Sequence, residues 1–74
     1  MRLDRCPMDR DLQVLSVLTP VALHLRMHEV GLRAGATVRV THVAPFGGRV
    51  VAVGASRIAL DSSTAGLIDV AVRP

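Results

Sequence analysis

The feature that most constrains this sequence is the recurrence of turn residues between short valine-rich runs over residues 30–60. Glycine or proline interrupts these runs at Gly31 and Gly35, at 45–48 and at 54–56. Turn signals about 8 to 12 residues apart are typical of small sandwiches and barrels. The spacing therefore predicts a small closed β-barrel.

The length of 74 residues indicates one domain, residues 1–74. This is near the lower size limit for a hydrophobic core that has no disulfide bonds or metal ions to stabilise it. Half of the residues are apolar but only one is aromatic, so the core must consist of Val, Leu and Ala, which favours strands. No run reaches the roughly 18 apolar residues of a membrane helix, and the charged start lacks the apolar centre of a signal peptide. We therefore expect a cytoplasmic protein.

The apolar pattern predicts five or six short strands, with one short helix after the first strand. Leu12–Leu18 is the first strand, and we expect Leu15 and Val17 to face the core, leaving Val14 open. Later strands are expected at 37–43, 49–54, 57–60 and 67–72. Their predicted inward residues are Val38, Val40, Ile58, Leu60, Ile68, Val70 and Val72.

The Thr-Pro pair at 19–20 predicts the start of a helix over residues 20–30. The threonine hydroxyl can cap free N–H groups while proline occupies the first helical position, which needs no N–H. Gly31 predicts a Schellman ending in which Leu32 folds back on Met27. About 11 residues are too few for a stable isolated helix, so we expect this one to cover an open end of the barrel.

Two shorter segments complete the prediction. Asp61, Ser62 and Ser63 are candidate caps for a single helical turn that ends at Gly66. The first eleven residues are polar, and their candidates for the core are Leu3, Cys6 and Met8.

A set of turn glycines and alternating valines runs through the second half of the chain. It comprises Val30-Gly31-Leu32 with Gly35, Val38 and Val40, Pro45–Gly48, Val51 and Val53 before Gly54, Ala59-Leu60, and the final Ile68 and Val70. Over roughly two thirds of its length the chain thereby resembles the FeoA family, small cytoplasmic proteins associated with bacterial ferrous iron transport.

This resemblance implies an SH3-like barrel, all-β apart from the short helix, with no catalytic activity of its own. It also implies a cytoplasmic accessory that binds the G-protein part of the membrane permease for Fe(II), and is peripheral to the inner membrane through that partner. A related SH3-like domain ends the metal-dependent repressors of the diphtheria-toxin-repressor type. The alternative function is therefore a free-standing domain of that type in transcriptional regulation.

Phe46, the sole aromatic residue, lies between Pro45 and Gly47 and is predicted to project as a rigid apolar tip. The alternative is that it folds over the barrel end to supplement a core poor in aromatics. We expect the partner contact at Leu32, Pro45, Phe46 and Gly47.

His24 and His28 lie four residues apart, so they share a helix face and could chelate a transition metal ion. Cys6 or His42 could supply a third ligand. Two histidines at helical spacing are common by chance, however, and Fe(II) sites also take carboxylates. We therefore expect no metal or cofactor, and His24 with His28 stays the alternative.

All nine basic residues are arginines and they are scattered singly. Those at 26, 33, 39, 49 and 57 could form a basic surface, but base-stacking aromatics are absent, which favours solvated faces over nucleic-acid binding. The sequence has no nucleophile elbow, phosphate loop or paired metal-ligand motif, so we expect neither an enzyme nor a small-molecule substrate. Edge strands leave self-association as an alternative.

Overall fold

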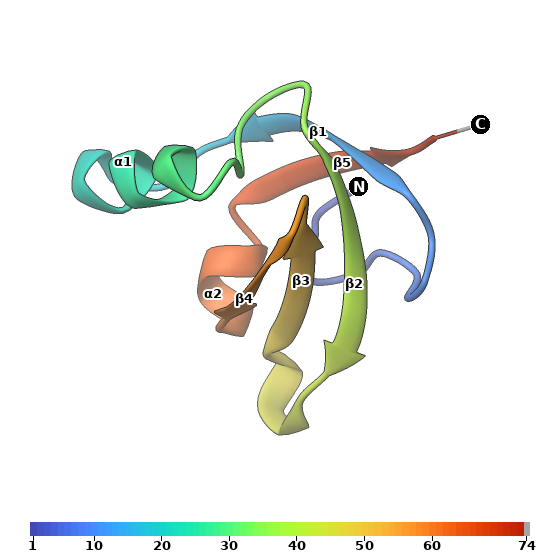
Figure 1. Ribbon diagram of the computed structural model, residues 1–74. Coiled ribbons are helices and arrows are strands. Elements are labelled where there is room, and N and C mark those ends of the chain that lie inside the picture. The colour runs from blue at the N-terminus through green and yellow to red at the C-terminus, as the bar shows by residue number, and fades with distance from the viewer. Residues whose placement is uncertain (74) are drawn as a thin grey trace.

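Five strands form a single antiparallel sheet in the order β4-β3-β2-β1-β5 (Figure 1). The computed structural model describes residues 1–73. Its elements are β1 Leu12–Val17, α1 Val21–Glu29, β2 Thr37–Val43, the 3-10 turn η1 Pro45–Gly47, β3 Arg49–Val53, β4 Ser56–Leu60, α2 Ser62–Ala65 and β5 Ile68–Val72. Neither described helix has the length and apolar character needed to span a membrane.

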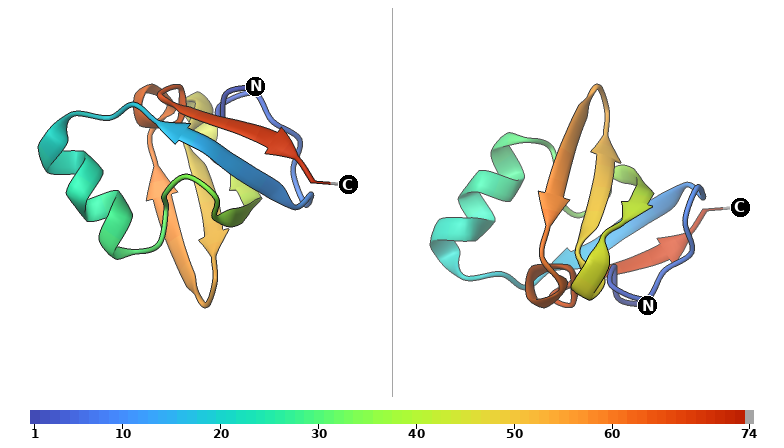
Figure 2. Two further views of the ribbon diagram at one scale, coloured as in Figure 1. Left: turned by 90° about the horizontal axis from the view of Figure 1, so that it is seen from above. Right: turned by 90° about the horizontal axis from the view of Figure 1, so that it is seen from below.

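The sheet curls because its strands diverge and bulge. β1 and β2 share only two residue pairs, beginning with Leu12 and Val38, and then separate. Bulges interrupt β1 against β5 after Val14, and β2 against β3 after Val40, and bulges increase local twist. As a result β1 and β5 cross the direction of the other three strands (Figure 2). The predicted β fold with a short helix after the first strand is confirmed; its sheet is curled, and within residues 1–73 no ladder joins β4 to β5.

Cross-strand valine pairs form the centre of the core. Val38 pairs with Val53 and Val40 with Val51, and all four side chains are buried. Apolar side chains that lie opposite each other on one sheet face stabilise the pairing. The alternation predicted for residues 37–43 is therefore confirmed. The other buried apolar residues are Leu3, Cys6, Leu12, Val14, Met27, Leu32, Leu60, Ala65, Ile68 and Val70.

The inward face of β1 differs from the prediction. Leu12 and Val14 are buried, Val17 packs partly against the core, and Leu15 is 49% exposed. The expectation that Leu15 faces inward was wrong. A bulge places two residues of one strand opposite one of its partner, so the alternation before and after it follows different phases. The bulge after Val14 has this effect here.

Helix α1 begins one residue later than expected and without a side-chain cap. Pro20 occupies the N-cap position, and its carbonyl accepts the first helical hydrogen bond from the His24 N–H at 2.8 Å. The predicted cap by Thr19 was wrong, because Thr19 lies one residue before the capping position. Its buried hydroxyl has no hydrogen-bond partner among the described residues.

The end of α1 matches the prediction. Gly31 adopts the left-handed conformation with φ of 93°, and the Leu32 N–H donates to the Met27 carbonyl at 2.8 Å. The Gly31 N–H donates to the His28 carbonyl at 3.0 Å, which completes a Schellman motif.

Most of α1 is nevertheless exposed. Only Met27 is buried and only Leu23 packs partly against the core. The helix projects from one side of the sheet (Figures 1 and 2). It therefore does not cover an end of the barrel as the sequence suggested.

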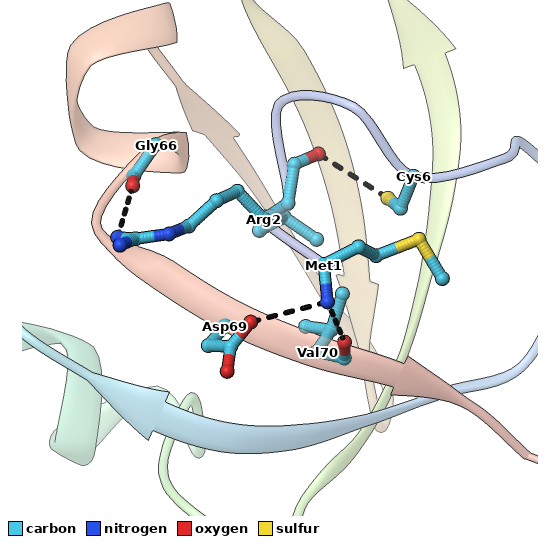
Figure 3. A network of polar contacts seen from close by, with 7 residues as sticks. Met1, Arg2, Cys6, Gly66, Asp69 and Val70 are labelled. Atoms are coloured by element: carbon cyan, nitrogen blue, oxygen red, sulfur yellow. Dashed lines mark hydrogen bonds and ion pairs between the residues drawn. The ribbon is translucent and has the colours of Figure 1, made fainter.

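The first residues run along β5 and cover its outer edge. The Leu3 N–H donates to the Ile68 carbonyl at 2.8 Å, and the Val70 N–H donates to the Met1 carbonyl at 2.7 Å. The Met1 ammonium lies 3.2 Å from an Asp69 carboxylate oxygen (Figure 3). These contacts make the polar segment part of the sheet.

Arg49 of β3 also holds the first residues of the chain in place. Its guanidinium donates to the Cys6 carbonyl at 3.1 Å and to the Asp4 carbonyl. The Cys6 thiol is buried and donates to the Leu3 carbonyl at 3.2 Å (Figure 3), and burial raises the pKa of this thiol. Leu3 and Cys6 thus belong to the core as predicted, whereas Met8 is exposed.

The two leucines of β1 give a matched test of this core. We expect Leu12→Ala to lower the free energy of unfolding by about 2–5 kcal/mol, because it leaves a cavity in a packed interior. Leu15→Ala removes an exposed side chain and should change it by less than about 0.5 kcal/mol. Urea unfolding followed by circular dichroism measures both. Equal losses in the two variants would contradict the observed face of β1.

Candidate partner-binding surface

A strained turn joins β2 to β3. The Ala44 N–H donates to the Gly48 carbonyl at 2.7 Å and closes the turn. Between them Phe46 has φ of 65° and ψ of 18°, and Gly47 has φ of 84°. The left-handed conformation is rare for a bulky residue and costs about 1–2 kcal/mol without glycine. Such strain is found most often at functional sites.

The same turn exposes a continuous run of apolar residues. Val43, Ala44, Pro45 and Phe46 are all exposed, and Phe46 is 100% exposed. We call residues 43–47 the apolar tip. Runs of three or more exposed apolar residues are unfavourable in a folded protein unless they have a function. Full exposure also rules out the alternative in which Phe46 supplements the core.

The tip rests on the start of α2. A Cβ atom added to Gly47 would lie 3.1 Å from the Ser62 Cβ, so the two backbones approach closely here. Of the three candidate caps, Asp61 caps α2, since its carboxylate accepts a hydrogen bond from the Thr64 N–H at 2.7 Å. This hydrogen bond lowers the pKa of the Asp61 carboxyl.

Leu32 does not belong to this surface. It is 1% exposed and packs in the core through the Schellman contact, so its expected role as a contact residue was wrong. It precedes β2, whereas the apolar tip follows that strand. The seven residues of β2, about 20 Å of strand at the rise of a β-strand, lie between them in the chain. Of the expected contact residues, Pro45 and Phe46 are exposed and Gly47 is partly buried.

Sequence reasoning missed Val43 and Ala44 as members of the tip. The signal was present, because the alternation of β2 gives way to four consecutive apolar residues, VAPF, before the double glycine. Val43 was predicted only as the end of a strand, and Ala44 was not among the expected contact residues.

The residues considered as metal ligands in the alternative do not gather into one group. His24 and His28 are exposed on α1, and the His28 Nε2 lies 3.5 Å from a guanidinium nitrogen of Arg33. Cys6 is buried in the first segment and His42 lies on β2. Within residues 1–73 no three His, Cys, Asp or Glu side chains gather as a metal-binding group.

The five arginines considered for a basic surface have different surroundings. Arg39 pairs with Asp11 at 2.7 Å, Arg33 lies against His28, and Arg49 binds backbone carbonyls. In the described part of the chain, Arg26 and Arg57 have no hydrogen bond or ion pair from their guanidinium groups.

Comparison with known proteins places this chain in a family. A family model, the FeoA domain, matches residues 1–72. A comparison with curated proteins gives no match.

Solved structures show the same fold. FeoA of Stenotrophomonas maltophilia, complexed with zinc and described as a prokaryotic SH3 domain protein, is 34% identical with a TM-score of 0.79. The match covers 96% of this chain and 89% of that one. FeoA of Chlorobium tepidum is 25% identical over 100% of this chain and 71% of that one, with a TM-score of 0.92.

Other matches are much longer than this chain. Iron(II) transport protein A of Clostridium thermocellum is 27% identical over 97% of this chain but only 45% of that one, with a TM-score of 0.87. The manganese regulator SloR is 16% identical, with a TM-score of 0.82 over 99% of this chain and 34% of that one, and shows the fold alone.

Phe46 allows a direct test of the strained, exposed conformation. We expect Phe46→Ala to leave the free energy of unfolding within about 0.5 kcal/mol of wild type, because no packing is lost. Phe46→Gly should raise it relative to Phe46→Ala by about 1 kcal/mol, because glycine adopts the left-handed region freely. Chemical denaturation measures both. A loss of about 3 kcal/mol in Phe46→Ala would indicate a buried ring instead.

Asp61 predicts a pH dependence. A carboxyl whose pKa is lower in the folded than in the unfolded state stabilises the fold above the unfolded pKa. This stabilisation is lost as the pH falls from the usual value near 3.8 through the lowered folded pKa. Asp61→Asn cannot titrate, so the difference in stability between wild type and this variant should shrink in that window. A titration of Asp61 by NMR at its usual value would contradict the capping role.

Proposed function

Because this chain belongs to the FeoA family, we propose that it is a non-catalytic accessory protein of ferrous iron transport. The family is linked to ferrous iron transport, and the similar proteins include one named for iron(II) transport and one described as a candidate transport-activating factor. We propose that this protein acts by binding, and that its partner is the cytoplasmic G-protein part of a membrane permease for Fe(II).

The apolar tip is the observation that carries this proposal. Binding interfaces are anchored by a few residues, among which aromatic side chains are enriched. Phe46 is the only aromatic residue of the chain and is fully exposed. Transfer of its ring into a pocket of the partner would contribute about 1.5–3 kcal/mol.

The backbone of the tip is prepared for such a contact. Pro45 fixes its own φ, and the turn is closed by hydrogen bonds between Ala44, Gly47 and Gly48. A turn that is ordered before binding loses little conformational entropy when it docks. The strain at Phe46 is thus consistent with a side chain held in place for a partner.

A deletion strain complemented with variants tests this proposal. Wild type should restore Fe(II) uptake and co-purify with the permease, whereas Phe46→Ala should lose both while remaining folded. Leu25→Ala is the matched control, because Leu25 is also exposed but lies on α1. Normal uptake and co-purification with Phe46→Ala, or the same loss with Leu25→Ala, would contradict binding through the tip.

A further inference from the structure

The two edges of the sheet differ in their surroundings. The outer edge of β5 is covered by the first residues, through the hydrogen bonds of Met1 and Leu3 to Val70 and Ile68. The outer edge of β4 has no such cover. Figure 2 shows β4 as the outermost strand on its side, with α1 beyond it, and among the described residues no hydrogen bond joins α1 to β4.

The register of β4 identifies which backbone groups are free. Ser56 pairs with Val53 across a two-residue turn, which makes this a hydrogen-bonded pair. In an antiparallel ladder the hydrogen-bonded pairs alternate, so Ser56, Ile58 and Leu60 direct their N–H and C=O groups to β3. Arg57 and Ala59 direct theirs away from the sheet. Within residues 1–73 these outward groups have no hydrogen-bond partner outside the ladder.

The side chains at this edge indicate the charge of a partner. Arg57 and Ala59 are exposed on one face, and Ile58 is partly buried on the other. The Arg57 guanidinium has no ion pair in the described part of the chain, whereas Arg39 on β2, separated from β4 by β3, is paired with Asp11. The Arg57 guanidinium is therefore available to pair with a carboxylate of a partner.

We propose that the outer edge of β4 binds an extended segment of a partner protein, which adds as a further strand and places a carboxylate side chain beside Arg57. Backbone hydrogen bonds to Arg57 and Ala59 would supply the pairing, and the carboxylate would set the preference for an acidic segment. This inference does not depend on the permease as the partner. The edge does adjoin the apolar tip, because β4 leads directly into Asp61 and Ser62, on which Gly47 rests.

A second copy of this chain fits the edge less well. Antiparallel pairing of two β4 strands would place Arg57 opposite Ala59 and the two Arg57 side chains diagonally, about 7–8 Å apart, on one face. Two arginine side chains at this spacing repel each other. A five-residue strand also buries far less than the roughly 1,200 Å² of a stable dimer.

The test uses the whole ¹⁵N-labelled protein and two synthetic peptides, acetyl-TVEVTV-amide and its lysine counterpart acetyl-TVKVTV-amide. The glutamate peptide should slow hydrogen exchange of the Arg57 and Ala59 amides and bind more tightly than the lysine peptide. Ala59→Pro removes an outward N–H without removing a bond to β3, and should weaken binding by about tenfold, the equivalent of one hydrogen bond. Ala59→Ser keeps the N–H and is the matched control.

Arg57→Glu leaves the backbone unchanged and keeps the test decisive if Ala59→Pro does not fold. It should reverse the preference, so that the lysine peptide binds more tightly. No protection of the two amides at millimolar peptide, equal binding by Ala59→Pro, or an unchanged preference in Arg57→Glu would overturn the proposal. So would dimerisation of the free protein through β4, seen by sedimentation and by protection of the same amides.

Discussion

The valine pairs between β2 and β3 are the contacts on which the rest of the structure depends. Val38 with Val53 and Val40 with Val51 give a buried sheet face made of small, stiff side chains. Such a face leaves space that must be filled, because protein interiors are close-packed. Larger side chains from outside the sheet, those of Leu3 and Met27 among them, fill it. The first segment is held in place by backbone pairing to β5 and by Arg49.

The composition of this core has a consequence for binding. Because Val, Leu and Ile close the interior, the only aromatic residue is left outside, at the end of the β2–β3 hairpin. The β2–β3 ladder, with its buried valines, makes the hairpin rigid. The exposed tip is therefore attached to a rigid part of the fold. Loops positioned by a rigid scaffold are where binding residues are usually found. The apolar tip is therefore a surface that follows from the way the core is filled.

Features set by local geometry could be predicted from the sequence. The alternation of β2, the Schellman motif at Gly31 and the capped helical turn after β4 each depend on a few neighbouring residues. The face of β1 could not be predicted, because its bulge arises from pairing with β5, which is distant in the sequence.

The candidate site was predicted in part, for the same reason. The exposure of Pro45 and Phe46 follows from their place in a tight turn. Leu32 was assigned to the surface although the predicted Schellman contact already placed it against Met27. The free groups of β4 require the strand order, which no local pattern gives.

Binding through the apolar tip is tested most directly by an NMR footprint. The ¹⁵N-labelled protein would be titrated with a purified cytoplasmic G-protein domain of a membrane permease for Fe(II), the proposed partner. The largest changes in amide signals should cluster at residues 43–48 and at Asp61–Ser63, around the tip and the start of α2. Changes confined to α1 or to the outer face of β1, or no changes at saturating partner, would contradict it.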